Sequence, residues 1–69
     1  MKVLSYDDLQ TEKGINFSRQ WVRKLVNAGK FPRPISLGGG ARVAFVESEI
    51  DDWLRARVRE RDASVQRAV

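Results

Sequence analysis

Apolar residues recur at helical spacing in three segments of the chain, and residues typical of helix ends bound each segment. The first is predicted to form a helix from Tyr6 to Lys13. Its start matches a capping box, because Ser5 can cap the first turn and Asp8 lies three residues further on. Gly14 follows as a stop, since glycine readily adopts the left-handed conformation that ends a helix. A short turn over residues 15–17 then leads to the next segment.

The second segment, Ser18 to Ala28, separates an apolar face from a basic one. Ser18 is predicted to cap this helix and Gly29 to end it. At about 100° per residue one arc forms the predicted core face; it carries Trp21, Val22, Leu25 and Val26. The opposite arc carries Arg19, Gln20, Arg23, Lys24 and Asn27. The segment therefore predicts an amphipathic helix whose outward face is basic.

Residues 31–46 predict an extended segment followed by a β-hairpin. Pro32 and Pro34 exclude a helix, because proline lacks a backbone donor and biases the residue before it toward extended conformations. Apolar residues then alternate along the chain on either side of three glycines. One face is expected to carry Ile35, Leu37, Val43 and Phe45, with Ala44 and Val46 opposite. The predicted tip is Gly38-Gly39-Gly40-Ala41.

The third helical segment is predicted to begin at Glu47 or Ser48. Acids crowd its first turns, where they complement the positive end of the helix dipole. Its apolar stripe consists of Ile50, Trp53, Leu54 and Val58. Beyond Asp62 the pattern weakens, so residues 63–69 are predicted to be a frayed tail.

The order helix, turn, basic helix, hairpin, helix is that of a winged helix-turn-helix. We therefore predict a mainly α fold with about three helices and a two-stranded wing over residues 1–62. Trp21, Phe45 and Trp53 are expected to fill the core, because a domain this small needs large aromatic side chains at its centre.

Composition narrows the classes of function. The 69 residues include no Cys and no His, which argues against disulfides, thiolate chemistry and the usual zinc sites. The triple glycine lacks the GxxxxGK[ST] pattern, and most acids are explained by helix starts. We expect no catalysis, no metal and no cofactor. No apolar run suits a membrane span or a signal peptide, which predicts a cytoplasmic protein.

The distribution of charge points to a polyanionic partner. The net charge is +4, and all nine acids lie outside the stretch from Lys13 to Val46, which holds seven of the 13 Lys and Arg residues. Positive and negative residues usually mix on an ordinary surface, so this stretch is the predicted face for double-stranded DNA.

Within that stretch, the basic helix is predicted to enter the major groove. Gln20, Arg23 and Arg19 are candidates to read base edges, since Arg suits guanine and Gln or Asn suits adenine. Lys24, Lys30 and Arg42 are candidates for phosphate contacts, and Ser18 marks a helix N-terminus that favours an anion. The full predicted DNA-binding set is Ser18, Arg19, Gln20, Arg23, Lys24, Asn27, Lys30, Arg33 and Arg42.

Several segments carry a family resemblance; they include Ser18–Trp21 (SRQW), Gly29–Ile35 (GKFPRPI) and Glu47–Leu54 (ESEIDDWL). With them the chain resembles the AlpA family of phage and prophage regulators, which is similar in fold to MerR-type winged helices and phage excisionases. The resemblance implies that the helix matching Ser18–Ala28 is the reader and that the hairpin matching Ile35–Val46 is the wing. The tip departs from the family pattern because it has no basic residue, which leaves Arg42 as the wing's expected backbone contact.

The resemblance leaves alternatives open. It implies a transcriptional regulator of mobile-element genes, or an excisionase that bends DNA at an attachment site. Integrase or RNA polymerase are then candidate protein partners. A third possibility, from another class, is a protein-interaction module such as an antitoxin or a packaging adaptor. With no heptad helix long enough for a coiled-coil dimer, we expect a monomer or cooperative side-by-side binding on DNA.

Overall fold

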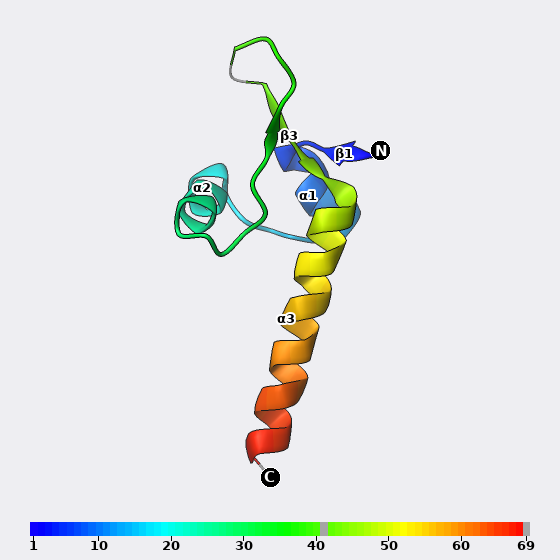
Figure 1. The fold of residues 1–69 in the computed structure, drawn as a ribbon, viewed down its shortest axis with the longest axis vertical. Helices are drawn as coiled ribbons and strands as arrows, with labels where there is room; N and C mark the ends of the chain where they lie inside the picture. Colours follow the sequence, from blue (N-terminus) through cyan, green and yellow to red (C-terminus); the bar gives the residue numbers. More distant parts are fainter. Residues whose placement is uncertain (41, 69) are drawn as a thin grey trace.

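A computed structural model describes residues 1–40 and 42–68 of the chain, and Figure 1 shows three helices and a small sheet. In chain order the elements are β1 (Val3–Leu4), α1 (Tyr6–Lys13), α2 (Arg19–Asn27), β2 (Ile35–Ser36), β3 (Val43–Val46) and α3 (Glu47–Ala68). α1, α2 and the sheet gather around the first part of α3, while its second part projects away from them. The predicted fold class, three helices with a winged hairpin, is confirmed.

The helix starts are built as their sequences predict. The Ser5 hydroxyl accepts a hydrogen bond from the Asp8 backbone N–H at 3.1 Å, and the Asp8 carboxylate accepts one from the Ser5 N–H at 3.1 Å. The Ser18 hydroxyl likewise accepts from the Trp21 N–H at 3.1 Å. Gly14 follows α1 with a φ of 67°, the left-handed conformation that glycine adopts without steric cost.

The sheet has a third strand that the sequence pattern did not predict. Its order is β1-β3-β2, all antiparallel, with Leu4 opposite Phe45 and Ile35 opposite Ala44. Because β3 is the central strand and α3 follows it directly, Ala44, Phe45 and Val46 are all buried. The predicted division of β3 into one core face and one outer face is therefore wrong. In the wing, the tip residue Ala41 lies outside the described residues.

Phe45 lies at the centre of the core, as predicted. It is fully buried, and its ring makes edge-on contacts with Tyr6 at 5.4 Å and Phe31 at 5.6 Å between centroids. Trp53 is half-buried at the edge of this cluster, with 4.7 Å between its ring centroid and that of Phe31. Its indole N–H donates a hydrogen bond to the Lys30 carbonyl at 2.8 Å. The hydrogen bond ties α3 to the end of α2 and satisfies the one polar atom of the indole.

Two residues of the predicted core are exposed instead. Trp21 is 47% exposed, because α2 packs through Val22, and Trp21 points about 100° away from Val22 around the helix. Val58 is also 47% exposed, since it follows Trp53 and Leu54, the residues of α3 that pack against the core after Ile50. Ile35 of the edge strand β2 and Leu37, which follows this strand, are also exposed, although they were expected on the same hairpin face as the buried Phe45.

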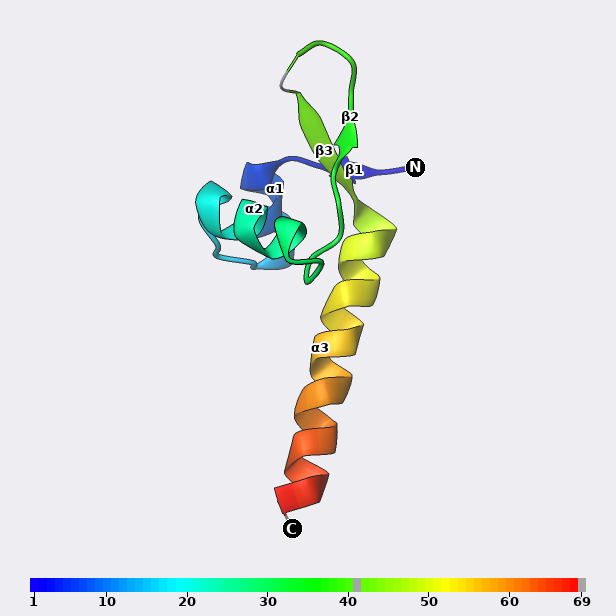
Figure 2. The ribbon, with the colours of Figure 1, turned by 60° about the vertical axis from the view of Figure 1, so that its left-hand side comes forward.

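The hairpin and the projecting part of α3 lie at opposite ends of the molecule. Figure 2 shows α1 and α2 next to each other on one side of α3, with the hairpin extending away from the projecting part of that helix. α3 continues as far as Ala68, so residues 63–68 are helical in backbone although the sequence pattern fades there. The domain boundary at residue 62 and the fraying of the tail stay predictions, and Val69 lies outside the described residues. Over residues 1–40 and 42–68, no helix combines the length and the apolar character needed to cross a bilayer.

Candidate nucleic-acid interface

All nine residues of the predicted DNA-binding set are exposed. The five that lie on α2 are accessible because the core contact of this helix is narrow: Val22 is buried, Leu25 and Val26 are half-buried, and the rest of the helix faces solvent. The narrow contact follows from the separation of apolar and polar residues around the helix. The first requirement for a reader helix, an accessible polar face, is therefore met.

Lys13, the first cation of the acid-free stretch, forms ion pairs within the fold and is not part of this surface. The Lys13 ammonium lies 2.9 Å from the Asp51 carboxylate and 3.2 Å from that of Glu47, both on α3. Lys2 adds ion pairs to Glu12 at 2.7 Å and to Glu47 at 3.6 Å. These carboxylates raise the pKa of Lys13, chiefly through the hydrogen bond to Asp51, and they raise the pKa of Lys2, chiefly through Glu12. The predicted polyanion face therefore begins at Arg19, not at Lys13.

Six exposed cations remain after Lys13 is set aside. Together they form what we call the basic α2–wing surface: Arg19, Arg23, Lys24, Lys30, Arg33 and Arg42. Within residues 1–40 and 42–68, none of the six makes an ion pair with a carboxylate. By contrast, Arg55, Arg57 and Arg61 of α3 each pair with a neighbouring acid. The positive charge of the middle of the chain is thus available to a partner.

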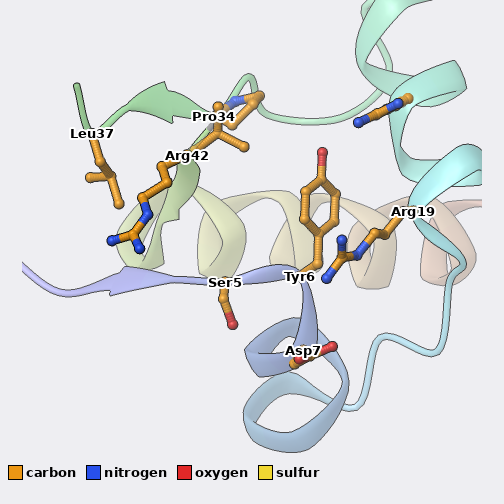
Figure 3. Close-up of a pocket in the computed structure, with 9 residues that line it drawn as sticks. Ser5, Tyr6, Asp7, Arg19, Pro34, Leu37 and Arg42 are labelled. Carbon is orange, nitrogen blue, oxygen red and sulfur yellow. The ribbon is translucent and has the colours of Figure 1, made fainter. Parts of the chain in front are cut away.

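Three of the six cations surround one hollow between the start of α1, α2 and the wing. Arg19 and Arg23 line it from α2, and Arg42 lines it from the wing, just before β3. In Figure 3, Tyr6 stands between Arg19 on one side and Arg42 on the other. The Arg19 guanidinium lies 5.3 Å from the centroid of the Tyr6 ring, a cation–π contact. Asp7 is the acidic residue at the rim of the hollow.

Other predicted site residues lie apart from this hollow. Gln20 and Lys24 line a second hollow on the outer side of α2, together with Ser18 and Trp21. Lys30 lines a third, beside Trp53 and Arg57. Asn27 and Arg33 line none of the three. The structure therefore brings the arginines of α2 and the wing together, but it does not bring the whole predicted set to one point.

Tyr6 and Trp21 line hollows of the site, although the sequence interpretation did not assign either of them to it. Tyr6 is half-buried, in a T-shaped contact with Phe45 and with its ring face toward Arg19. Trp21 was expected in the core. A signal was present for Trp21, because it lies at the margin of the apolar arc and next to Gln20 in the sequence.

Part of this chain is similar in sequence to known proteins. The family model described as "Prophage CP4-57 regulatory protein (AlpA)" matches residues 10–58, which include α2, the wing and the packed part of α3. A protein of Enterobacteria phage P4, "Uncharacterized protein ORF88", is 39% identical over 41 residues. The aligned segment is 59% of this chain and 46% of that protein, so the chain spans less than half the length of the relative.

Proposed function

Because the chain belongs to the AlpA family of prophage regulatory proteins, we propose that it binds double-stranded DNA sequence-specifically and regulates transcription of phage or mobile-element genes. The observation that carries the proposal is the basic α2–wing surface, in which six exposed cations have no acidic partner among the described residues. A surface of this sign attracts the phosphate backbone of a duplex.

The dimensions of α2 suit the major groove. Its nine residues give a length of about 14 Å, and a helix with side chains is about 10–12 Å across, close to the width of the groove. Gln20, Lys24 and Asn27 lie on the outward arc, where they reach the floor or walls of the groove. Amide side chains at these positions are suited to adenine, and Arg23 beside them is suited to guanine.

Arg19 receives a different role from the one its position in the sequence first suggested. Since its guanidinium lies over Tyr6, it faces the hollow beside the wing and not the outward arc. We assign Arg19 and Arg42 to phosphates of one DNA strand, with base reading left to Gln20, Arg23 and Asn27. The surface then holds the backbone on its wing side while the centre of α2 lies over the bases.

Fluorescence anisotropy with labelled duplexes over a range of salt concentrations tests the proposal. Five phosphate contacts, one from each of the six cations except the base-reading Arg23, at −0.9 each give a slope of log K against log salt of about −4.5. The double variant Arg23→Ala with Lys24→Ala is expected to weaken binding strongly. A charge-matched control, Arg55→Ala with Arg59→Ala on α3, is expected to bind like the wild type. Absence of binding to any duplex at low salt contradicts the proposal.

An architectural role in recombination is the second candidate, because the family resemblance extends to excisionases. The same surface serves both functions, and contacts with an integrase or RNA polymerase stay predictions. An excisionase is expected to bind several adjacent sites and to bend the duplex, whereas a simple regulator needs neither. Circular-permutation mobility shifts separate the two, since only a bend makes mobility depend on the position of the site within the fragment.

A further inference from the structure

Two large aromatic side chains lie exposed at the start of α2. Phe17 is 42% exposed and Trp21 is 47% exposed, and their rings make an edge-on contact with centroids 6.4 Å apart. We call this pair the aromatic patch. Both rings belong to apolar residue types that the core of a small domain normally recruits. Contiguous exposed apolar side chains with a polar rim are typical of interaction sites, whereas apolar residues scattered singly over a surface are not.

The aromatic patch is continuous with the polar face of the helix. Trp21 lines the outer hollow of α2 together with Ser18, Gln20 and Lys24, and this hollow has no acidic lining residue. Around the helix, Trp21 lies about 60° from Lys24 and about 100° from Gln20. It borders the outward arc on the side away from Arg19 and Arg23. A duplex that reaches Gln20 and Lys24 therefore also covers Trp21.

We propose that the aromatic patch recognises the C5-methyl group of thymine in the major groove. The inference rests on the proposed function, because it requires α2 to lie in that groove. The N-terminal part of a reader helix is the part that contacts base edges. The major groove displays one apolar group, the thymine methyl, and apolar side chains contact it. Trp21 is in the first turn of α2, so its indole supplies such a contact beside the hydrogen-bonding side chain of Gln20.

A second copy of the chain fits the aromatic patch less well. A symmetric contact through Trp21 places the same residues of both copies against each other. Lys24 of one copy then lies near Lys24 of the other, with no carboxylate in the hollow to compensate. The charge around the aromatic patch is complementary to a polyanion and not to itself.

The test uses duplexes selected from a random library with the wild-type chain. Each selected duplex is then synthesised with deoxyuridine in place of thymidine, one position at a time, which removes only the methyl group. At one or two positions the wild type is expected to lose about fourfold in affinity, the factor that matches burial of one CH₂-sized group. Trp21→Ala is expected to bind the thymidine and deoxyuridine duplexes equally. Its fold is checked by circular dichroism.

Lys24→Ala is the matched control from the same hollow. It is expected to weaken binding to both duplexes by the same factor and to keep the thymidine preference. Equal affinity of the wild type for both duplexes overturns the inference, as does a preference that survives Trp21→Ala. A third outcome assigns the aromatic patch to a second copy instead: the wild type self-associates in sedimentation experiments, Trp21→Ala does not, and the wild type shows no thymidine preference. If the library yields no selected duplex at all, the proposed function itself fails, which is a separate result.

Discussion

The Arg19 guanidinium lies over the ring of Tyr6, with 5.3 Å between the guanidinium carbon and the ring centroid. The ring is itself held at its edge by Phe45, 5.4 Å away at the centre of the core. The Arg19 side chain has four rotatable bonds, and it is thereby oriented through Tyr6 by the buried core around Phe45. Because Arg19 is exposed, the contact contributes little to folding. Its main effect is to direct one positive charge toward the wing.

Removal of the Tyr6 ring is expected to weaken DNA binding. In Tyr6→Leu the guanidinium loses the surface on which it rests, and we expect the Kd for a duplex to rise about two- to fivefold, as for an exposed cation–π contact. Tyr6→Phe keeps the ring and is expected to bind like the wild type. Fluorescence anisotropy gives both values, and circular dichroism confirms that both variants fold. Equal weakening in the two variants shows that the hydroxyl group is what matters.

The two tryptophans are expected to differ in their effect on stability. Trp53→Ala removes a ring packed on Phe31 and the hydrogen bond to the Lys30 carbonyl, so the free energy of unfolding should fall by about 3 kcal/mol. Trp21→Ala should change it by about 0.5 kcal/mol or less, as for other surface substitutions. Urea denaturation followed by circular dichroism measures both. A loss of similar size in the two variants contradicts the assignment of Trp21 to the surface.

The same pair shows where prediction from sequence reached its limit. Helical periodicity identifies both tryptophans as members of an apolar arc, but it does not say how wide the buried strip is. That width depends on neighbouring elements: Trp53 meets the buried Phe31, which precedes the wing, whereas the aromatic neighbour of Trp21, Phe17, is itself exposed. The caps of α1 and α2 were predictable, because their hydrogen bonds join residues three apart.

Long-range partners were the other feature that the sequence alone did not determine. β1 has two residues, too few for any periodicity, and it is a strand only because β3 pairs with it, Val3 with Val46 and Leu4 with Phe45, from far along the chain. Lys13 was assigned to the polyanion face by its place in an acid-free stretch. Its carboxylate partners, Glu47 and Asp51, lie on α3 and come near it only in the fold. The six other cations of that stretch were assigned correctly as exposed.

The ion pairs of Lys13 predict a loss of stability at high pH. Its pKa is raised above the ordinary 10.5, chiefly by the hydrogen bond to Asp51, so the folded state holds this proton more tightly than the unfolded state. The resulting stabilisation is fully present below pH 10.5 and is lost as the pH rises through the folded pKa. Thermal melting between pH 8 and 12 measures it.

Lys13→Arg is the informative control for this pH dependence. Arginine keeps its charge over the whole range, so the variant should lose less stability than the wild type above pH 10.5. Lys24→Arg, at a position with no ion pair among the described residues, should follow the wild-type curve. A Lys13→Arg curve that coincides with the wild type shows that other groups control the alkaline transition.

The last prediction concerns the projecting part of α3. From Arg57 to Ser64 every side chain is exposed, whereas Ile50 is fully buried and Trp53 and Leu54 are half-buried against the core. A chain that ends at Asp62 therefore loses no packed side chain described by the structure. Its free energy of unfolding and its duplex affinity should stay within about 0.5 kcal/mol of the full chain, as for changes at an exposed surface.

A chain that ends at Asp52 provides the contrast, because it lacks Trp53 and Leu54 and should not fold. Urea denaturation and anisotropy on the same three chains separate the outcomes. If the chain ending at Asp62 is destabilised by more than about 1 kcal/mol, residues 63–69 contribute to the domain, and the boundary at residue 62 is wrong. If its stability is kept but its affinity falls, the tail contributes to DNA binding instead, and Arg67 is the basic residue that the truncation removes.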